Sequence, residues 1–499
     1  MSKLYEPCVD EFDNVHYVKK ILSQGGQGIV FRTSDPDTAI KLVTDDNGNI
    51  VTSRNVVDTY LEKFRRIRLL PVPKDANITF PAALLSGKAG YVMTFLEGMR
   101  PAGSLRINSF SASKINDNEI PQWLVEMPDK NAAKQIVAYY KSGGLRSRLL
   151  VLFKISSQLA LLHGAGLVYG DISHNNIFFS DKDDRYNIWL IDADNLKYEG
   201  EKGTVYTPRY GAPELVLNKS FGTMACDCYS FAVLAYEMLT MVHPFFGKKV
   251  YGKENDWADT NNNDGDPEAQ ALMGNYPWVG DTQDDSNCSD KGLPPVLLYD
   301  NEIAELFQRT FGGGRKEPSK RPVIFHWPYA FARAADSTIQ CPGCKMSYRY
   351  DYKVAENGLE RCPYCDKPKP AMIVMEAYSW ENNALGKKQW TFVREIDLSV
   401  NMTFPSRLFS VFSVTKSDIP VLEIYIRNDS SVLFKRREDA DMEFSIATRE
   451  NDDGRFMKLS SQIRFKSFSG GKNISEFHIY VSYNNLSRMV ICTIKDAVK

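Results

Sequence analysis

Three polar residues in the middle of the chain have the spacing of a site that handles phosphate and metal. Asp171 and Asn176 lie five residues apart between apolar segments, and Asp192 follows sixteen residues later at the end of an apolar run. A carboxylate in such a loop can accept or orient the proton of a hydroxyl group. Asn176 and Asp192 offer the oxygen ligands that Mg²⁺ prefers. Each residue alone could instead cap a loop or a turn.

A glycine-rich run and a lysine precede these residues. Gly25, Gly26 and Gly28 lie between apolar stretches, and glycine lets the backbone approach phosphates where a side chain would collide. Alone, the run fits a simple hairpin turn equally well. Lys41 follows in an apolar strand, where phosphate oxygens would satisfy its ammonium group. The alternative is a lysine at a strand edge that reaches water.

Four cysteines form two C-x-x-C pairs separated by seventeen residues: Cys341, Cys344, Cys362 and Cys365. This spacing is a strong signature of a zinc site with four thiolate ligands. Because four sulfur ligands close the coordination shell, we expect structural Zn²⁺. Free thiols or a redox pair are the alternative.

The pattern of apolar residues divides the chain into regions that would position these side chains. Short strands begin near residue 17, helical periodicity dominates residues 146–331, and alternation with a period of two runs from 372 to 499. The last region predicts a β-sandwich or barrel. In the helix predicted around residues 57–64, the apolar face consists of Val57, Tyr60, Leu61 and Phe64. Glu62 falls nearly opposite this face.

Bulk composition excludes several classes of protein. With 499 residues the chain is too long for one hydrophobic core, and a net charge of −1 gives no general attraction to nucleic acid or anionic membranes. The longest apolar stretch, residues 149–168, is interrupted by polar residues, so we expect no membrane segment. The N-terminus lacks a signal-peptide core, and nine cysteines, an odd number, fit a reducing cytoplasm better than a disulfide framework.

Taken in order, these motifs resemble the signature set of protein kinases. The run 23–30 is similar to the glycine-rich loop, 39–41 to the strand with the ATP-contacting lysine, and 91–98 to the hinge, with Met93 as gatekeeper. The run 207–214 resembles the end of the activation segment. The resemblance also implies that Arg321 pairs with Glu214, and that this pair closes the activation segment.

The resemblance implies roles for individual residues. Those implied for catalysis are Asp171, Lys41, Asn176 and Asp192. Those implied for ATP binding are Gly25, Gly26, Gly28, Val30, Ala39, Lys41, Met93, Thr94 and Leu96. Asn176 and Asp192 would hold Mg²⁺ or Mn²⁺, so the implied cofactors are ATP, that metal and structural Zn²⁺.

The fold class that follows is α+β. We expect a bilobal kinase domain at 15–332, with a small lobe at about 15–98 and a large lobe at about 99–332. A zinc ribbon at 338–368 and an all-β domain at 370–499 would follow.

The implied function is ATP-dependent phosphorylation of Ser/Thr hydroxyls by a cytoplasmic enzyme of the bacterial, eukaryotic-like kind. Thr207 favours Ser/Thr over Tyr specificity. The architecture loosely resembles kinases of tellurite-resistance-like stress or defence loci, which implies a protein substrate and a cognate phosphatase or signalling partner. The alternatives are a pseudokinase scaffold and, less in keeping with the activation-segment motif, a small-molecule kinase.

The sequence also departs from the kinase pattern. Ser173 stands where a lysine normally contacts the γ-phosphate, with His174 as one candidate to replace its charge. Ala193 and Asp194 replace Phe and Gly of the D-F-G motif, and Tyr169 replaces a histidine. Because Glu62 points away from the apolar face of its helix, no Lys41–Glu62 ion pair is predicted.

Overall fold

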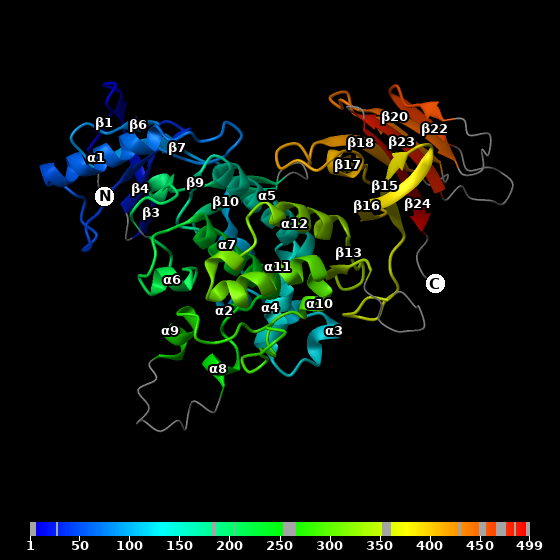
Figure 1. The fold of residues 1–499 in the computed structure, drawn as a ribbon, viewed down its shortest axis with the longest axis horizontal. Helices are drawn as coiled ribbons and strands as arrows, with labels where there is room; N and C mark the ends of the chain where they lie inside the picture. The colour runs from blue at the N-terminus through cyan, green and yellow to red at the C-terminus, as the bar shows by residue number, and fades with distance from the viewer. Residues whose placement is uncertain are drawn as a thin grey trace.

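The computed structural model describes residues 6–25, 28–181, 186–203, 205–252, 266–351, 361–427, 431–448, 456–465, 476–483 and 486–495. Figure 1 shows a small, sheet-based lobe and a β-rich C-terminal domain on opposite sides of a helical large lobe. The predicted bilobal α+β kinase fold followed by a β-rich region is confirmed.

The small lobe is built on a five-stranded antiparallel sheet. Its order is β3 (Val18–Gly25), β4 (Gly28–Thr33), β5 (Thr38–Leu42), β7 (Gly90–Thr94) and β6 (Ala83–Leu84). Alternate residues such as Phe31, Ile40 and Val92 are buried on one face. An N-terminal hairpin, β1 (Cys8–Val9) and β2 (Val15–His16), adds Cys8 to this core.

Helix α1 (Arg54–Arg68) packs against β6, β7 and the turn η4 (Ala193–Asn195). Its buried residues Val57, Leu61, Phe64 and Ile67 repeat at three- and four-residue intervals, as an amphipathic helix requires. Three basic residues in its last turn complement the helix dipole.

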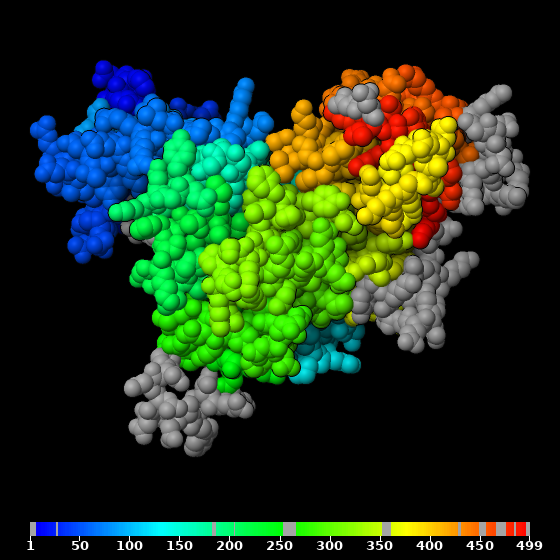
Figure 2. All heavy atoms as spheres, viewed as in Figure 1, coloured from blue at the N-terminus to red at the C-terminus, as the bar shows by residue number. Residues whose placement is uncertain are grey.

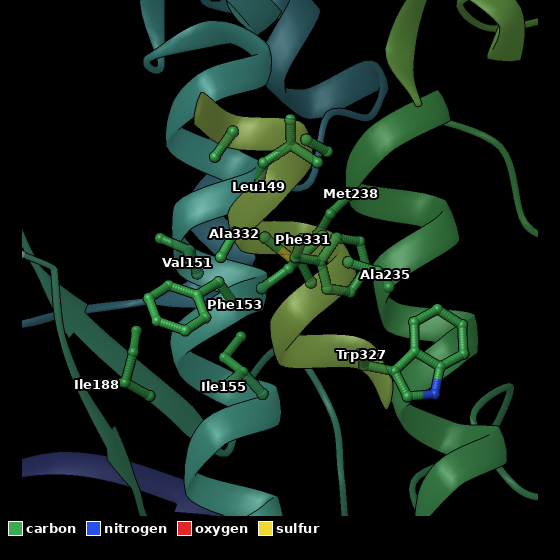
Figure 3. Packing of buried hydrophobic residues seen from close by; sticks show 14 of the residues in the cluster. Leu149, Val151, Phe153, Ile155, Ile188, Ala235, Met238, Trp327, Phe331 and Ala332 are labelled. Atoms are coloured by element: carbon green, nitrogen blue, oxygen red, sulfur yellow. The ribbon is translucent and has the colours of Figure 1, made fainter. Parts of the chain in front are cut away.

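Three long helices form the centre of the large lobe: α5 (Gly144–Gly164), α7 (Met224–Thr240) and α12 (His326–Asp336). Figure 3 shows Phe153 of α5 on the side of Ile188, and the α12 residue Phe331 between α5 and α7. The rings of Phe231 and Trp327 meet edge to face with their centroids 5.5 Å apart. This packing fixes the helices that hold the loops described below.

The remaining large-lobe elements surround these three helices. The strands are β8 (Arg100–Pro101), β9 (Leu167–Val168), β10 (Ile177–Ser180), β11 (Asn187–Leu190) and β12 (Lys197–Tyr198). The helices are η1 (Ala102–Leu105), α2 (Ser109–Ser113), η2 (Asp117–Glu119), α3 (Gln122–Val125), α4 (Lys130–Lys141), α6 (Pro213–Val216), α8 (Lys248–Tyr251), α9 (Pro267–Leu272), α10 (Pro295–Leu298), α11 (Asn301–Phe311), η6 (Gly313–Arg315) and η7 (Pro318–Lys320).

The C-terminal domain is a sandwich of two antiparallel sheets. One has the order β16 (Ala384–Glu395), β15 (Met372–Glu381), β24 (Leu486–Lys495), β23 (Glu476–Tyr483), β20 (Glu443–Thr448) and β21 (Met457–Lys458). The other has the order β17 (Met402–Pro405), β18 (Pro420–Ile426), β19 (Val432–Arg436) and β22 (Gln462–Phe465), and a short helix α13 (Ser406–Phe409) follows β17. Phe434 and Phe477 join the two sheets with ring centroids 5.0 Å apart.

A cysteine-containing hairpin, β13 (Thr338–Gln340) and β14 (Ser347–Arg349), links the large lobe to the sandwich. The sandwich packs on the large lobe, as the space-filling view in Figure 2 shows. At the contact, Arg407 of α13 forms a buried ion pair with Asp336 of α12, with 2.6 Å between Nη2 and Oδ1. The β-rich domain is therefore docked by specific contacts.

Candidate active site

The loop between β9 and β10 holds Asp171 in a fixed orientation. The Asn176 side-chain amide donates to the Asp171 carbonyl at 3.0 Å and to its Oδ2 at 2.9 Å. The Thr207 hydroxyl donates to Asp171 Oδ1 at 2.7 Å. Asp171 is 6% exposed, so its carboxylate is oriented by a loop amide on one side and by the activation segment on the other.

Helix α7 holds this loop in place through Asp227. The backbone amides of Tyr169 and Gly170 donate to the two carboxylate oxygens of Asp227, at 2.8 and 3.0 Å. Gly170 has φ +86°, a left-handed conformation that glycine adopts without strain. The Tyr169 hydroxyl donates to the carbonyls of Asn176 and Ile191 and so ties the loop to the strand before Asp192.

Asp192 leaves β11 in an unusual conformation. Its φ of 61° and ψ of 66° are left-handed, which costs a non-glycine residue on the order of 1–2 kcal/mol. The side chain then lies 2.5 Å from the ammonium of Lys41, measured from Oδ1 to Nζ. The structure therefore joins two residues that are 151 positions apart in the chain.

Lys41 lies in β5 and is 4% exposed. Its Nζ also donates to Asp194 Oδ2 at 2.7 Å, and the hydroxyl of Tyr91 donates to the other oxygen, Oδ1, at 2.8 Å. Burial alone would lower the pKa of Lys41, but the charges of Asp194 and Asp192 outweigh it and raise the pKa. Lys41 is therefore positively charged at neutral pH.

The electrostatics around Asp192 suit a cation. Burial raises the pKa of Asp192, and the nearby carboxylates of Asp194 and Asp171 act in the same direction against the attraction of Lys41. Asp192 and Asp194 share one ammonium and Asp171 acts on Asp192 from nearby, so a divalent metal ion held by Asp192 and Asn176 would relieve the excess negative charge. The donor set fits the Mg²⁺ or Mn²⁺ that the sequence implies.

The glycine-rich loop forms the turn between β3 and β4, with Gly25 opposite Gly28. A Cβ on Gly28 would lie 2.4 Å from the carbonyl oxygen of Leu42, so no side chain fits there. A Cβ on Gly25 would meet no atom within 4 Å, which leaves the space that a phosphate cover requires. Gly26 lies outside the described residues.

The other residues expected around ATP lie on β4, β5 and β7 or directly after β7. Val30 pairs with Lys41 across β4 and β5, and Ala39 pairs with Met93 across β5 and β7. Met93 is half-buried, Thr94 at the end of β7 is exposed, and Leu96 is half-buried in the segment that follows. These positions match an adenine site at the junction of the lobes, which stays a prediction.

The activation segment is closed by the ion pair that the resemblance implied. Arg321 binds Glu214 through two hydrogen bonds, Nη1 to Oε1 at 2.7 Å and Nη2 to Oε2 at 2.8 Å. His174 does not supply the charge that Ser173 lacks. Its Nδ1 lies 2.8 Å from the Tyr210 hydroxyl, and burial lowers its pKa from 6.5, which keeps it neutral.

The four cysteines of the C-x-x-C pairs converge, with all Sγ atoms within 4.8 Å of one another. The Cys341–Cys365 and Cys344–Cys362 sulfur distances are both 3.6 Å, too long for disulfides. Tetrahedral Zn²⁺ with Zn–S bonds of about 2.3 Å requires sulfurs about 3.8 Å apart. The cluster can therefore hold such an ion.

Sequence reasoning gave no role to two residues of this site. Asp194 was noted only as a departure from the kinase pattern, and Tyr91 only as the start of the hinge. A usable signal was present in Asp194, because a second acid two residues after Asp192, next to an apolar strand, requires a partner if it is buried.

Comparison with known proteins agrees with this geometry. Residues 124–293 match the family model described as the protein kinase domain, and this range contains Asp171, Asn176 and Asp192. The chain contains a protein kinase domain. The range ends before the four-cysteine cluster and the β-sandwich.

Curated relatives are protein kinases that match over a limited length. Human ribosomal protein S6 kinase alpha-3 is 34% identical over 20% of this chain, and a probable serine/threonine-protein kinase of Dictyostelium discoideum is 30% identical over 19%. Leucine-rich repeat serine/threonine-protein kinase 1 of Caenorhabditis elegans is 28% identical over 24%. The matched segments cover 14%, 6% and 6% of these relatives, respectively.

Among the described residues, no helix is both long and apolar enough to cross a membrane.

Proposed function

We propose that this protein is an ATP-dependent serine/threonine kinase. It transfers the γ-phosphoryl group of ATP to a hydroxyl of a protein substrate. The observation that carries the proposal is the joining of Lys41, Asp192, Asp171 and Asn176 at one site, in the order that kinases use. Asp171 would orient the substrate hydroxyl, and Asn176 and Asp192 would hold the metal ion that neutralises the phosphates.

Ser/Thr specificity is supported by Thr207, whose hydroxyl contacts Asp171 at 2.7 Å, and by the Ser/Thr kinases among the relatives. We further propose a cytoplasmic enzyme of bacterial stress or defence signalling with a cognate phosphatase or signalling partner. The free cysteines fit a reducing compartment, and the stress assignment rests on the order of domains alone. In this proposal residues 338–368 form a zinc ribbon, with Zn²⁺ bound by the four cysteines.

A pseudokinase scaffold is the second candidate. It is favoured by Ser173, which is 1% exposed and stands where kinases carry a lysine. In this alternative the chain binds partners through its four-cysteine segment and its β-sandwich without transferring phosphate.

The test uses the purified full-length chain with labelled ATP, Mg²⁺ and a generic basic protein substrate. We expect the wild type to transfer label and Lys41→Met and Asp171→Asn to lose at least about 100-fold in rate, because general-base and electrostatic groups contribute on that order. Undiminished transfer by Asp171→Asn would refute its assignment. Tight metal-free ATP binding by a wild type that transfers nothing would instead establish the scaffold.

A further inference from the structure

The lysine of the kinase site has an unassigned buried partner. Asp194 lies in the turn η4, its side chain is 8% exposed, and it forms an ion pair of 2.7 Å with the ammonium of Lys41. A buried ammonium requires a compensating negative charge, because leaving it unpaired costs several kcal/mol. Asp192 also contacts Lys41, but its role in the proposed reaction is to hold metal.

Helix α1 offers no carboxylate for this purpose. Its two acidic residues, Asp58 and Glu62, are both exposed, whereas the face that packs on the sheet is apolar. In particular, Phe64 is fully buried and meets the ring of Tyr91 edge to face, with centroids 4.8 Å apart. Aliphatic and aromatic side chains therefore occupy the contact between α1 and the sheet.

Both carboxylate oxygens of Asp194 are engaged. Oδ2 accepts from Lys41, and Oδ1 accepts at 2.8 Å from the hydroxyl of Tyr91, a residue of the neighbouring strand β7. Tyr91 is fully buried and is held by Phe64, so the carboxylate is fixed from two sides. A group held in this way is suited to position a neighbour and poorly placed to bind a metal ion.

We propose that Asp194 is the positioning residue for Lys41, and that it keeps the ammonium directed at the ATP phosphates once Asp192 has bound metal. The inference rests on the proposed kinase function. Because the partner comes from the same turn as Asp192, the lysine, its counter-ion and the metal ligand form one unit. Helix α1 reaches this unit through the contact of Phe64 with Tyr91 and through its packing against η4, the turn that holds Asp194.

The experiment measures ATP affinity, by displacement of a fluorescent ATP analogue in excess Mg²⁺, for the full-length chain. Asp194→Asn keeps the size of the side chain and removes its charge. We expect its ATP dissociation constant to rise on the order of 10- to 100-fold, the range for a hydrogen bond to a charged group. At saturating ATP, the Mg²⁺ concentration that gives half of the maximal ATP binding should be the same in Asp194→Asn as in the wild type. Tyr91→Phe should weaken ATP binding in the same direction by a smaller factor.

Two control variants separate the alternatives. Glu62→Gln should bind ATP as the wild type does, and Lys41→Met/Asp194→Asn should bind no more weakly than Lys41→Met alone, because the two residues act through each other. Equal weakening by Glu62→Gln would overturn the proposal, as would a shifted Mg²⁺ requirement with unchanged ATP affinity in Asp194→Asn. A further loss in the double variant, together with a lowered thermal unfolding midpoint, would make Asp194 merely structural.

These readouts do not require phosphoryl transfer. A chain that shows all of these binding effects and transfers no phosphate would refute the proposed kinase activity and leave the role of Asp194 standing.

Discussion

The ion pair between the buried carboxylate of Asp336 and Arg407 should be the strongest single contact between the large lobe and the β-sandwich. Asp336 ends α12, is 1% exposed, and accepts hydrogen bonds from Arg407 Nε at 2.7 Å and Nη2 at 2.6 Å. It also accepts from the indole nitrogen of Trp390 at 2.8 Å. We predict that Asp336→Asn weakens the docking of the sandwich, because the substitution preserves volume and removes the charge that Arg407 requires.

The magnitude follows from the burial of the pair. The Arg407 side chain is 5% exposed; its other hydrogen bond is to the carbonyl of Ser417 at 3.4 Å, and its guanidinium lies 5.7 Å from the centre of the Phe153 ring. Removing one member of a buried ion pair costs about 3–5 kcal/mol, mostly because the other charge is left uncompensated. The indole of Trp390 can still donate to the amide oxygen, so it adds little to the loss.

The double variant Asp336→Asn/Arg407→Met provides the decisive comparison. Replacing both charges with residues of similar size is often close to neutral, so the double variant should recover most of the lost stability. The matched control is Lys154→Met, which breaks the more exposed 2.7 Å ion pair with Asp418 at the same contact and should cost about 1 kcal/mol or less.

The assay is urea unfolding of the full-length chain, followed by tryptophan fluorescence and by limited proteolysis between the domains. Trp390 lies at the contact, 3% exposed, and its ring stacks on Phe412 with centroids 6.1 Å apart, so separation of the domains should change its emission. A loss below about 1 kcal/mol in Asp336→Asn, or a double variant no more stable than that single variant, would refute the reasoning.

Two further predictions concern metal and pH. The reduced chain should contain about one Zn²⁺, and Cys362→Ser should release it and loosen the sandwich while ATP binding persists; metal analysis that finds no zinc in the wild type would refute the site. His243 is 6% exposed, with Nδ1 accepting from the Phe245 amide at 3.2 Å and Nε2 donating to the Arg209 carbonyl at 3.0 Å. Burial lowers its pKa from 6.5 to about 4, so the unfolded chain binds the proton more readily between these values. The contribution of His243 to the free energy of unfolding should therefore be complete above pH 6.5 and fall by about 3 kcal/mol towards pH 4. Parallel urea titrations of His243→Gln should lack this loss. A loss of the same size in His243→Gln would contradict a neutral buried histidine as its cause.

Local patterns predicted the elements that depend on nearby residues. The apolar spacing in α1 identified Val57, Leu61 and Phe64 as buried, and Ile67, one turn further, completes the face. The same spacing placed Glu62 away from the sheet, where the structure has it exposed. The pairing of Glu214 with Arg321 came from family resemblance, because no local signal joins residues 107 positions apart.

The partner of Lys41 could not be predicted from local sequence patterns. Its contact with Asp194 spans 153 positions and depends on how the turn after Asp192 meets a strand of the other lobe. The N-terminal hairpin was missed for another reason, since its strands have two residues each, too few for any periodicity. The sandwich was predicted from alternation, but its docking through Asp336 and Arg407 is a long-range ion pair between chemically ordinary residues.

The charges of the site set a condition on the proposed chemistry. Kinases that carry a lysine at the position of Ser173 bring two side-chain ammonium groups to the phosphates, whereas Lys41 is the one charged amine found here among the described residues of the site. His174 is neutral and bonded to Tyr210, so it does not restore the missing charge. Asp192 and Asp194 share this single ammonium and Asp171 acts on Asp192 from nearby, so the net negative charge of these carboxylates would repel ATP. The proposed transfer therefore depends on metal ions to a greater degree than the motifs alone suggest, because they must offset both these carboxylates and the charge that develops on the phosphates.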